Sequence, residues 1–259
     1  MNTEKNKTER SDRSDRKGKL SVVGIGPGGK LDRTLRAEKT IANCEVVVGY
    51  TKYLELVEDL TKGKELVSTG MTREVDRVRA AITRASEGLS VALISSGDAG
   101  IYGMAGLAIE LTESMGVDLP VEVIPGVSAA SSAGAKLGAP LALDFATISL
   151  SDLLVPWDTI KKRLEAVAEA DMVVALYNPK SKKRVSQLEE AAEIFRKYRP
   201  GATPVGVCDS ISLDGERIVI TTLDKFLNEE IAMRTTVIIG NTSSKIIDGR
   251  FVNPRGYDV

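Results

Sequence analysis

The sequence predicts an α/β protein with two α/β domains in tandem. Short apolar runs rich in branched residues alternate with helix-forming segments along most of the chain. Several of these runs end in glycine- or serine-rich stretches, which is typical of strands that open onto ligand loops in a parallel sheet. At 259 residues the chain is long enough for two domains of ordinary size. We expect a charged tail at residues 1–18, a first domain at 19–142 and a second at 143–259, because Pro140 ends a helix near their junction.

The elements of the first domain follow from apolar runs that are separated by polar, helix-forming segments. They are predicted, in chain order, as a strand at 20–24, a helix at 33–41, a strand at 46–48, a helix opening at 70–79, a strand at 89–94, a helix at 107–111, a strand at 121–124 and a helix of small residues at 125–135. The tail before them has no apolar residue between positions 2 and 19, so we expect it to be disordered and solvated. A role in steering anions is the alternative for this tail.

The second domain repeats the alternation of strands and helices. Its predicted elements are a strand at 145–150, a helix at 157–168 that starts after Pro156, a strand at 172–177 closed by Asn178-Pro179, a helix at 184–198, and strands at 205–208, 216–221 and 235–239. The carboxyl end at 253–257 shows no periodicity, and we predict no regular structure there.

The composition excludes several classes of protein. With 42% hydrophobic and 27% charged residues and a net charge of −1, the chain lacks the marks of a nucleic-acid or membrane binder, and we expect neither partner. It contains no histidine, which excludes an imidazole base and histidine-ligated metals, and we expect no metal site. Two distant cysteines, Cys44 and Cys208, favour a reducing compartment. No secretory signal or membrane-spanning run is evident, so we expect a cytoplasmic protein.

The loop at residues 24–29 matches the G-x-G-x-x-G pattern of dinucleotide-binding turns. Two features argue against that interpretation. Pro27 removes a backbone N–H from the turn that would hold a pyrophosphate. The strand at 46–48 is followed by Gly49-Tyr50 rather than by the acid that would bind a ribose diol.

The loop at residues 95–106 is the strongest candidate for a ligand loop. It follows a buried strand and precedes a helix, and its four glycines let the backbone approach a bound molecule closely. Asp98 is its only carboxylate; the alternative is a tight turn in which Asp98 caps the helix. Because the loops at 24–29, 95–106 and 125–135 all follow strands of one sheet, we expect them to share one crevice.

These loops, taken together with other short motifs in the same order, carry a resemblance to a known family. The further motifs are Ile148-Ser149-Leu150-Ser151-Asp152-Leu153-Leu154, Leu176-Tyr177-Asn178-Pro179, Gly240-Asn241-Thr242 and Pro254-Arg255-Gly256-Tyr257. The set resembles the tetrapyrrole methylases, which are S-adenosylmethionine-dependent methyltransferases of corrin and sirohaem biosynthesis. The resemblance extends from about Leu20 to Tyr257.

The resemblance implies S-adenosylmethionine as the cofactor, in a trough between two α/β domains, and usually a homodimer. By motif position, the residues that would contact the cofactor are Pro27, Ser96, Gly97, Asp98, Ile101, Ser128, Ala129, Tyr177, Asn178, Thr235 and Thr236. The implied substrate is a corrin precursor, precorrin-3B or cobalt-precorrin-3, methylated at C17 with contraction of the ring. Another tetrapyrrole methylase that acts at a different carbon, and a non-catalytic nucleotide-binding module, are the alternatives.

Methyl transfer from a sulfonium needs alignment above all, whereas ring contraction also requires proton movement. The candidates for moving protons are Asp152, Ser149, Tyr102 and Asp144. For Asp152 the alternative is capping of the helix that follows Pro156. A corrin precursor carries many carboxylates, so cationic side chains must gather locally. The candidates for binding the substrate are Arg73, Arg77 and Arg184.

Overall fold

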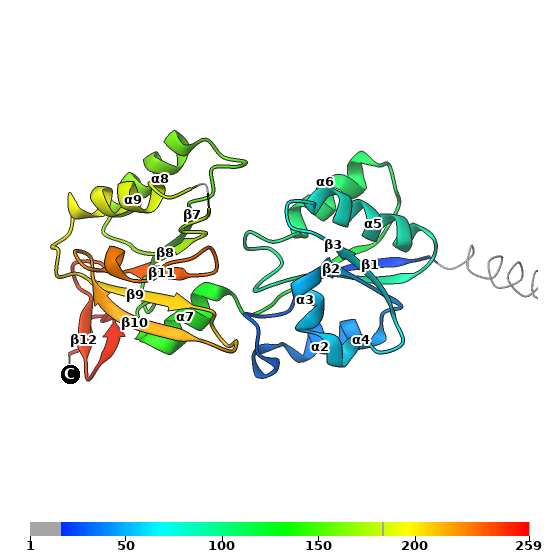
Figure 1. The fold of residues 1–259 in the computed structure, drawn as a ribbon, viewed down its shortest axis with the longest axis horizontal. Helices are drawn as coiled ribbons and strands as arrows, with labels where there is room; N and C mark the ends of the chain where they lie inside the picture. Colours follow the sequence, from blue (N-terminus) through cyan, green and yellow to red (C-terminus); the bar gives the residue numbers. More distant parts are fainter. Residues whose placement is uncertain (1–16, 183, 259) are drawn as a thin grey trace, which may run out of the picture. The chain divides into compact units, whose positions relative to one another are not determined.

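The computed structural model describes residues 17–182 and 184–258, so the tail predicted for residues 1–18 lies almost entirely outside the described residues. The chain forms two compact units that divide between Ser128 and Ala129. Each unit is built around its own five-stranded sheet with helices packed on it (Figure 1). The prediction of two α/β domains in tandem is confirmed.

The first unit has a fully parallel sheet in the order β3-β2-β4-β1-β5. Its strands are β1 (Lys19–Gly24), β2 (Val46–Tyr50), β3 (Glu65–Thr69), β4 (Ser90–Ser95) and β5 (Val121–Ile124). Four of the five match predicted strands. Strand β3 was not predicted, because it lies at the sheet edge, is largely exposed and lacks the apolar run that marks the buried strands.

Helices cover both faces of this sheet, which explains why its inner strands are apolar throughout. The helical elements are η1 (Lys30–Asp32), α2 (Leu35–Asn43), α3 (Thr51–Glu55), α4 (Glu58–Thr61), α5 (Glu74–Ser86) and α6 (Ala105–Ser114). Residues of α2 and α3 pack with Val23 of β1 on one face, whereas residues of α5 and α6 pack with Val22 on the other. Successive strand residues therefore point into different cores.

The neighbouring strands β1 and β4 lead to helices on opposite faces of the sheet. The chain leaves β1 for α2 on one face and leaves β4 for α6 on the other. Ligands bind in parallel sheets at such a switch point, outside the carboxyl ends of the strands. The topology thus places the loops at 24–29 and 95–106 where a ligand is expected.

The second unit has a mixed sheet in the order β10-β9-β11-β8-β7, in which only β7 and β8 form a parallel pair. Its strands are β7 (Phe145–Ser149), β8 (Val173–Tyr177), β9 (Pro204–Asp209), β10 (Arg217–Thr222) and β11 (Thr236–Ile239). One face is covered by α8 (Trp157–Glu169) and α9 (Gln187–Arg196), with η2 (Phe226–Asn228) beside them. The opposite face carries α7 (Ala129–Leu137).

Helix α7 belongs to the second unit. The predicted boundary at 142/143 placed it in the first domain, and this part of the prediction is wrong. Its apolar side packs against the second sheet through Ala130, Ala133 and Leu137. The fit is close at Gly206 of β9, where an added Cβ would lie 2.2 Å from Cδ1 of Leu137. The units divide before α7 because this helix buries its apolar side on the second sheet.

A small third sheet in the order β12-β13-β6 completes the second unit. Strands β12 (Lys245–Ile247) and β13 (Arg250–Val252) form a hairpin, and β13 pairs with β6 (Gly138–Ala139). The turn consists of Asp248 and Gly249, which both have positive φ, of 48° and 70°. An Asp-Gly pair between two short branched runs is a strong hairpin signal, although no hairpin was predicted here.

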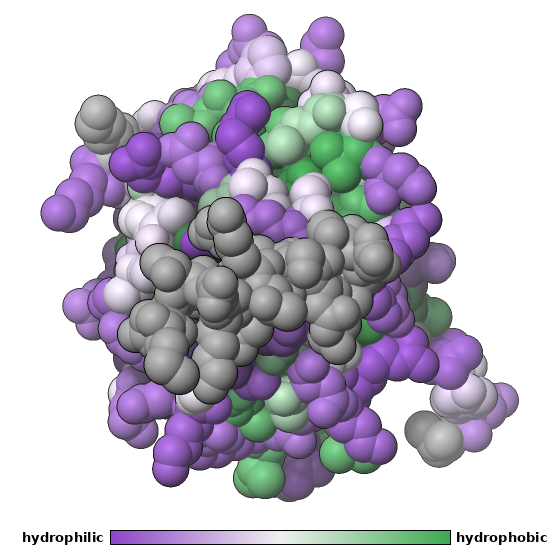
Figure 2. Space-filling view, turned by 90° about the vertical axis from the view of Figure 1, so that its right-hand side faces the viewer, coloured by the Kyte–Doolittle hydropathy of each residue, from purple (hydrophilic) through white to green (hydrophobic). Residues whose placement is uncertain are grey.

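No helix among the described residues is long and apolar enough to cross a bilayer. Figure 2 shows one face of the molecule, on which hydrophilic side chains predominate and hydrophobic ones gather in limited patches.

Candidate functional site

The loops that follow β1 and β4 are tied to each other by their backbones. The N–H of Gly26 donates to the carbonyl of Gly97 at 3.1 Å, and the N–H of Gly97 donates back to the carbonyl of Gly26 at 2.7 Å. Both glycines have positive φ, of 77° and 65°, which few other residues tolerate. The two loops at the switch point therefore form one connected backbone structure.

The loop after β5 joins them through three glycines in direct backbone contact, Gly24, Gly97 and Gly126, which we call the glycine junction. A Cβ on Gly126 would lie 2.2 Å from the Gly97 carbonyl oxygen, and a Cβ on Gly24 would lie 2.7 Å from the Gly126 nitrogen. No side chain fits at either position. The three strand-end loops therefore meet, whereas the shared crevice expected of them stays a prediction. Gly24 and Gly126 were not among the predicted site residues.

Asp98 joins the loops after β4 and β5. Its Oδ1 accepts a hydrogen bond from the N–H of Gly100 at 2.8 Å, and its Oδ2 accepts one from the N–H of Gly126 at 3.0 Å. Helix α6 begins after Met104 and has no side-chain cap, so the alternative in which Asp98 caps this helix is wrong. The cofactor contact expected of Asp98 stays a prediction, and it would use lone pairs that these two bonds leave available.

The tip of the β4 loop exposes two large side chains at this edge. Ile101 is 38% exposed and Tyr102 is 50% exposed. Tyr102 has a φ of +53°, an uncommon conformation for a bulky residue and one often held at functional sites. The other predicted cofactor residues at these strand ends are half-buried or buried, namely Pro27, Ser96, Gly97, Ser128 and Ala129.

In the second unit, the parallel pair β7 and β8 brings Ser149 and Asn178 together at its carboxyl edge. The Nδ2 of Asn178 donates to the Oγ of Ser149 at 3.0 Å, and the N–H of Ser151 donates to the same oxygen at 3.2 Å. Two donors occupy the two lone pairs of this hydroxyl. Ser149 can therefore present its O–H as a donor, whereas it is poorly placed to take up a proton.

Arg184 contacts the residues around this arrangement, and only 8% of its side chain is exposed. Its Nη2 donates to the carbonyl of Asn178 at 2.7 Å, and its Nη1 lies 3.5 Å from the Oγ of Ser151 and 3.9 Å from the Oδ1 of Asp152. Its Nε has no hydrogen-bond partner among the described residues. Arg184 precedes α9 and does not start it. Its hydrogen bonds connect the loop after β7 with the loop after β8.

Asp152 is held by α9 and not by the helix whose capping was the alternative. Its Oδ2 accepts a hydrogen bond from Nε2 of Gln187 at 2.9 Å. The residue before α8 is Pro156, and this helix has no side-chain cap, so the capping alternative for Asp152 is wrong. The proton-transfer role of Asp152 stays a prediction, as does that of the exposed Asp144.

Tyr177 directs its side chain toward α7. Its hydroxyl accepts a hydrogen bond from the N–H of Ala130 at 2.9 Å, in the first turn of that helix. Helix N-termini need such acceptors, because their first N–H groups have no partner within the helix. The Tyr177 hydroxyl thus supports the start of α7, and the cofactor contact expected of this residue stays a prediction.

Thr235 and Thr236, both predicted to approach the cofactor, are 1% and 3% exposed. The Oγ1 of Thr235 donates to Oδ1 of Asp209 at 2.6 Å, and the hydroxyl of Ser210 donates to Oδ2 at 2.7 Å. Burial alone would raise the pKa of the Asp209 carboxyl, but these two hydrogen bonds, with the charges of nearby arginines, hold its pKa below the ordinary value. Asp209 is therefore a stable carboxylate at neutral pH.

The two arginines predicted on one helical face occupy different surroundings. Arg77 is 4% exposed, and it donates to the Thr69 hydroxyl at 2.7 Å and to the Gly70 carbonyl at 2.8 Å. Arg73 precedes α5, is 65% exposed along its side chain and pairs with Asp76 at 2.8 Å. Of these two arginines, Arg73 is the one that presents its charge to solvent. Substrate binding stays a prediction for both.

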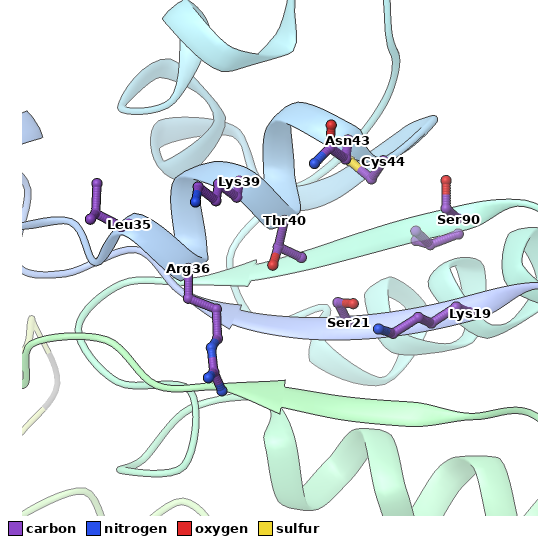
Figure 3. A pocket seen from close by; sticks show the side chains of 10 residues that line it. Lys19, Ser21, Leu35, Arg36, Lys39, Thr40, Asn43, Cys44 and Ser90 are labelled. Carbon is purple, nitrogen blue, oxygen red and sulfur yellow. The ribbon is translucent and has the colours of Figure 1, made fainter.

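A separate hollow of about 420 Å³ runs along α2 and reaches the amino ends of β1 and β4 (Figure 3). Lys19, Arg36 and Lys39 line it, together with the buried thiol of Cys44, and Figure 3 shows these residues along the helix and the strands beside it. None of the predicted site residues lines this hollow. We therefore place the candidate site at the carboxyl ends of the strands and not here.

Comparison with known proteins gives a consistent result. The sequence pattern of the family described as Tetrapyrrole (Corrin/Porphyrin) Methylases matches residues 19–227. The chain is 46% identical to the probable cobalt-factor III C(17)-methyltransferase of Salmonella typhimurium, over 92% of this chain and 99% of that protein. It is 49% identical to the cobalt-factor III methyltransferase of Priestia megaterium, over 93% of this chain but only 45% of that longer protein. The crystal structure of the methyltransferase CobJ superimposes with a TM-score of 0.87 at 31% identity, covering 92% of this chain and all of that one.

Proposed function

The chain belongs to the tetrapyrrole methylase family, and on this premise we propose that it is an S-adenosylmethionine-dependent methyltransferase of cobalamin biosynthesis. It methylates C17 of cobalt-factor III or of precorrin-3B, with contraction of the macrocycle. The observation that carries the proposal is the likeness to the Salmonella protein, which extends over nearly the full length of both chains. The Priestia protein is about twice as long, and nothing of its remaining part is carried over to this chain.

The residues at the first edge fit a sulfonium nucleoside better than a dinucleotide. The glycine junction offers a surface made of backbone, against which a ligand can lie closely. Helix α2 starts only at Leu35, and its first turn is capped by Thr34, whose Oγ1 accepts from the N–H of Ala37 at 3.1 Å. The glycine loop therefore opens onto the three-residue 3-10 turn η1 and not directly onto the N-terminus of an α-helix, as a pyrophosphate site does. Pro27 in this loop is no obstacle to a ligand without phosphates.

We assign cofactor binding to the residues predicted for it at both edges, with the loop at 95–103 as the main contributor. S-adenosylmethionine supplies a methyl group that is already activated, so the task left to the protein is to align the substrate carbon with it. The oriented O–H of Ser149 donates a hydrogen bond to an oxygen of the substrate, because its own oxygen is occupied by two donors. Proton movement during ring contraction falls to Asp152, Tyr102 or Asp144.

Product analysis tests the substrate. The full chain is incubated with S-adenosylmethionine and either cobalt-factor III or metal-free precorrin-3B, and the products are examined by mass spectrometry and NMR. The proposal expects the gain of one methyl group at C17 of at least one substrate. Methyl gain at another carbon would assign the chain to a different reaction of the same family. No methyl gain, with calorimetric binding of ATP or NAD but not of S-adenosylhomocysteine, would favour a nucleotide-binding module.

Two further expectations belong to this proposal, the homodimer and the cytoplasmic location. Light scattering after gel filtration tests the first, and we expect a mass of twice 27.8 kDa. Fractionation of the source cells tests the second. Both cysteines are free and buried, which is compatible with a reducing compartment.

A further inference from the structure

The loops that follow β7 and β8 form one structural unit, which we call the loop pair. It consists of residues 150–156 and of the described residues of 178–186. Because β7 and β8 are parallel neighbours, both loops leave the same edge of the second sheet. They are joined by the hydrogen bond from Asn178 to Ser149 and by Arg184, which contacts both Asn178 and Ser151. Side-chain hydrogen bonds thus connect the two loops into one structural unit.

Three aliphatic side chains of the loop pair are exposed to solvent. Leu153 is 78% exposed and Leu154 is 95% exposed, and Val185 on the other loop is 53% exposed. Single exposed aliphatic residues need no explanation, but Leu153 and Leu154 are adjacent and directly follow Ser151 and Asp152, which Arg184 and Gln187 hold. An exposed apolar pair beside such a polar network indicates a binding surface. Hydrogen bonds hold the polar residues of these loops, whereas nothing among the described residues covers the two leucines.

The charge of the loop pair is positive. Its described residues carry three cations, Lys180, Lys182 and Arg184, and one carboxylate, Asp152, which Gln187 and Arg184 already engage. Among the described residues, no carboxylate lies within ion-pair distance of Lys180 or Lys182. In a chain whose net charge is −1, this local excess of unpaired ammonium groups favours an anionic ligand.

We propose that the loop pair is the surface that receives the substrate macrocycle, an inference that rests on the proposed function. Leu153 and Leu154 lie against the apolar face of the ring, and Lys180 and Lys182 bind carboxylates at its periphery. A corrin precursor combines these two properties, a broad apolar ring and an acidic rim. The donor hydroxyl of Ser149 sits at the root of the same loops, so a ring held there has a hydrogen-bond donor close to it.

The hairpin of β12 and β13 provides a matched comparison within the same unit. It also exposes a lysine and two neighbouring aliphatic residues, Lys245, Ile246 and Ile247, with the isoleucines 48% and 52% exposed. This hairpin belongs to the separate third sheet. Exposure alone therefore does not distinguish the loop pair, whereas its place at the carboxyl ends of β7 and β8 does.

Steady-state kinetics on the full chain test the inference, with whichever of cobalt-factor III and precorrin-3B the wild type methylates. For Leu153→Ser/Leu154→Ser we expect the KM for the macrocycle to rise at least about tenfold, since the burial of even one leucine is worth that much. For Lys180→Gln/Lys182→Gln we expect a rise of about five- to tenfold at low salt that shrinks in about 0.5 M salt, because screening weakens exposed charge pairs. In both variants the affinity for S-adenosylhomocysteine should stay unchanged.

The control variant is Ile246→Ser/Ile247→Ser, which should keep the wild-type KM. Unchanged KM values in both loop variants would overturn the inference and leave the proposed function standing. A changed oligomeric mass for the leucine variant with an unchanged KM would also overturn it, because the leucines would then meet a second copy of the chain. If the wild type methylates neither macrocycle, the proposed function itself fails, and this outcome appears before any variant is measured.

Discussion

The carboxyl edges of the two sheets are built in different ways. At the first edge three loops meet through backbone atoms at the glycine junction, where a single added carbon would overlap a neighbouring carbonyl. At the second edge the loops are joined by side chains, through Ser149, Asn178 and Arg184. A junction of backbone atoms has one geometry and tolerates little change, whereas a network of side chains can be altered one group at a time. In the proposed function, the first edge contributes most of the cofactor contacts, whereas the second edge contributes fewer of them and also receives the substrate.

The largest effect is expected from Gly126→Ala at the first edge. Its Cβ would lie 2.2 Å from the Gly97 oxygen, and both partners are backbone, so strands must shift at a cost of about 3 kcal/mol or more. Trp157, the only tryptophan, lies in α8 and reports on the second unit. The melting temperature followed by circular dichroism should therefore fall markedly, and the melting temperature followed by Trp157 fluorescence should fall less.

Gly106→Ala is the matched control in the same unit. An added Cβ at Gly106 meets nothing within 4 Å, and the residue lies in α6, so we expect a change of no more than about 1 kcal/mol, in the stabilising direction. Equal melting temperatures for Gly126→Ala and the wild type would contradict the account of the glycine junction.

The next effect is expected from Arg184→Leu at the second edge. The change leaves the Asn178 carbonyl without its donor and should cost about 1–3 kcal/mol in the unfolding transition seen by Trp157. Arg184→Lys should restore only part of this loss, because an ammonium cannot span both Asn178 and Ser151 as the guanidinium does. The control is Arg163→Leu on the exposed side of α8. Similar losses for both leucine variants would show that Arg184 has no special role.

A smaller effect, on kcat, distinguishes whether the Ser149 hydroxyl donates a hydrogen bond or takes up a proton. For Ser149→Ala we expect kcat to fall about tenfold, the value of one hydrogen bond, while the pH profile keeps its shape. Ser149→Thr retains the hydroxyl and should recover part of the rate. Loss of one limb of the pH profile in Ser149→Ala would mean that Ser149 takes up a proton, against the bonding seen at its oxygen.

The smallest effect concerns the dependence of stability on pH. The pKa of Asp209 is lowered in the folded protein, so its carboxylate stabilises the fold above the unfolded pKa of about 4, and this contribution disappears as pH falls through the folded pKa. Thr235→Val removes one of the donors responsible and should cost about 1 kcal/mol at pH 7. In urea titrations followed at Trp157, the gap between the variant and the wild type should narrow toward pH 3. If the difference in stability between the variant and the wild type widened on acidification, the Thr235 hydroxyl would not be bonding to the ionised form of Asp209.

The elements that sequence predicted well are those whose residues bury apolar side chains. Strands such as 20–24 and 121–124 show this pattern plainly, and the glycines after them announce the loops. The exposed strand β3 gives no such signal. Strand direction in the second sheet is also not encoded locally, because β10 and β11 have the same apolar pattern whether they run parallel or antiparallel to β9.

The sequence predicted where the candidate site residues lie along the strands, but not which hydrogen bonds they make. The sequence placed Asp98 and Ser149 at strand ends, where the structure also has them. It could not show that both oxygens of Asp98 meet backbone N–H groups, or that Tyr177 reaches Ala130 across 47 positions of the chain. Arg77 illustrates the same limit, since burial against Thr69 depends on the unpredicted strand β3.

The central claim is that the glycine junction and the loop at 95–103 hold the cofactor, and amide hydrogen exchange tests it most directly. The full chain is compared with and without S-adenosylhomocysteine. The account predicts slower exchange at residues 95–103 and 125–129 and no change along α2 at residues 35–43. Protection confined to α2, or none at the strand-end loops in a sample that calorimetry shows to be saturated, would contradict it.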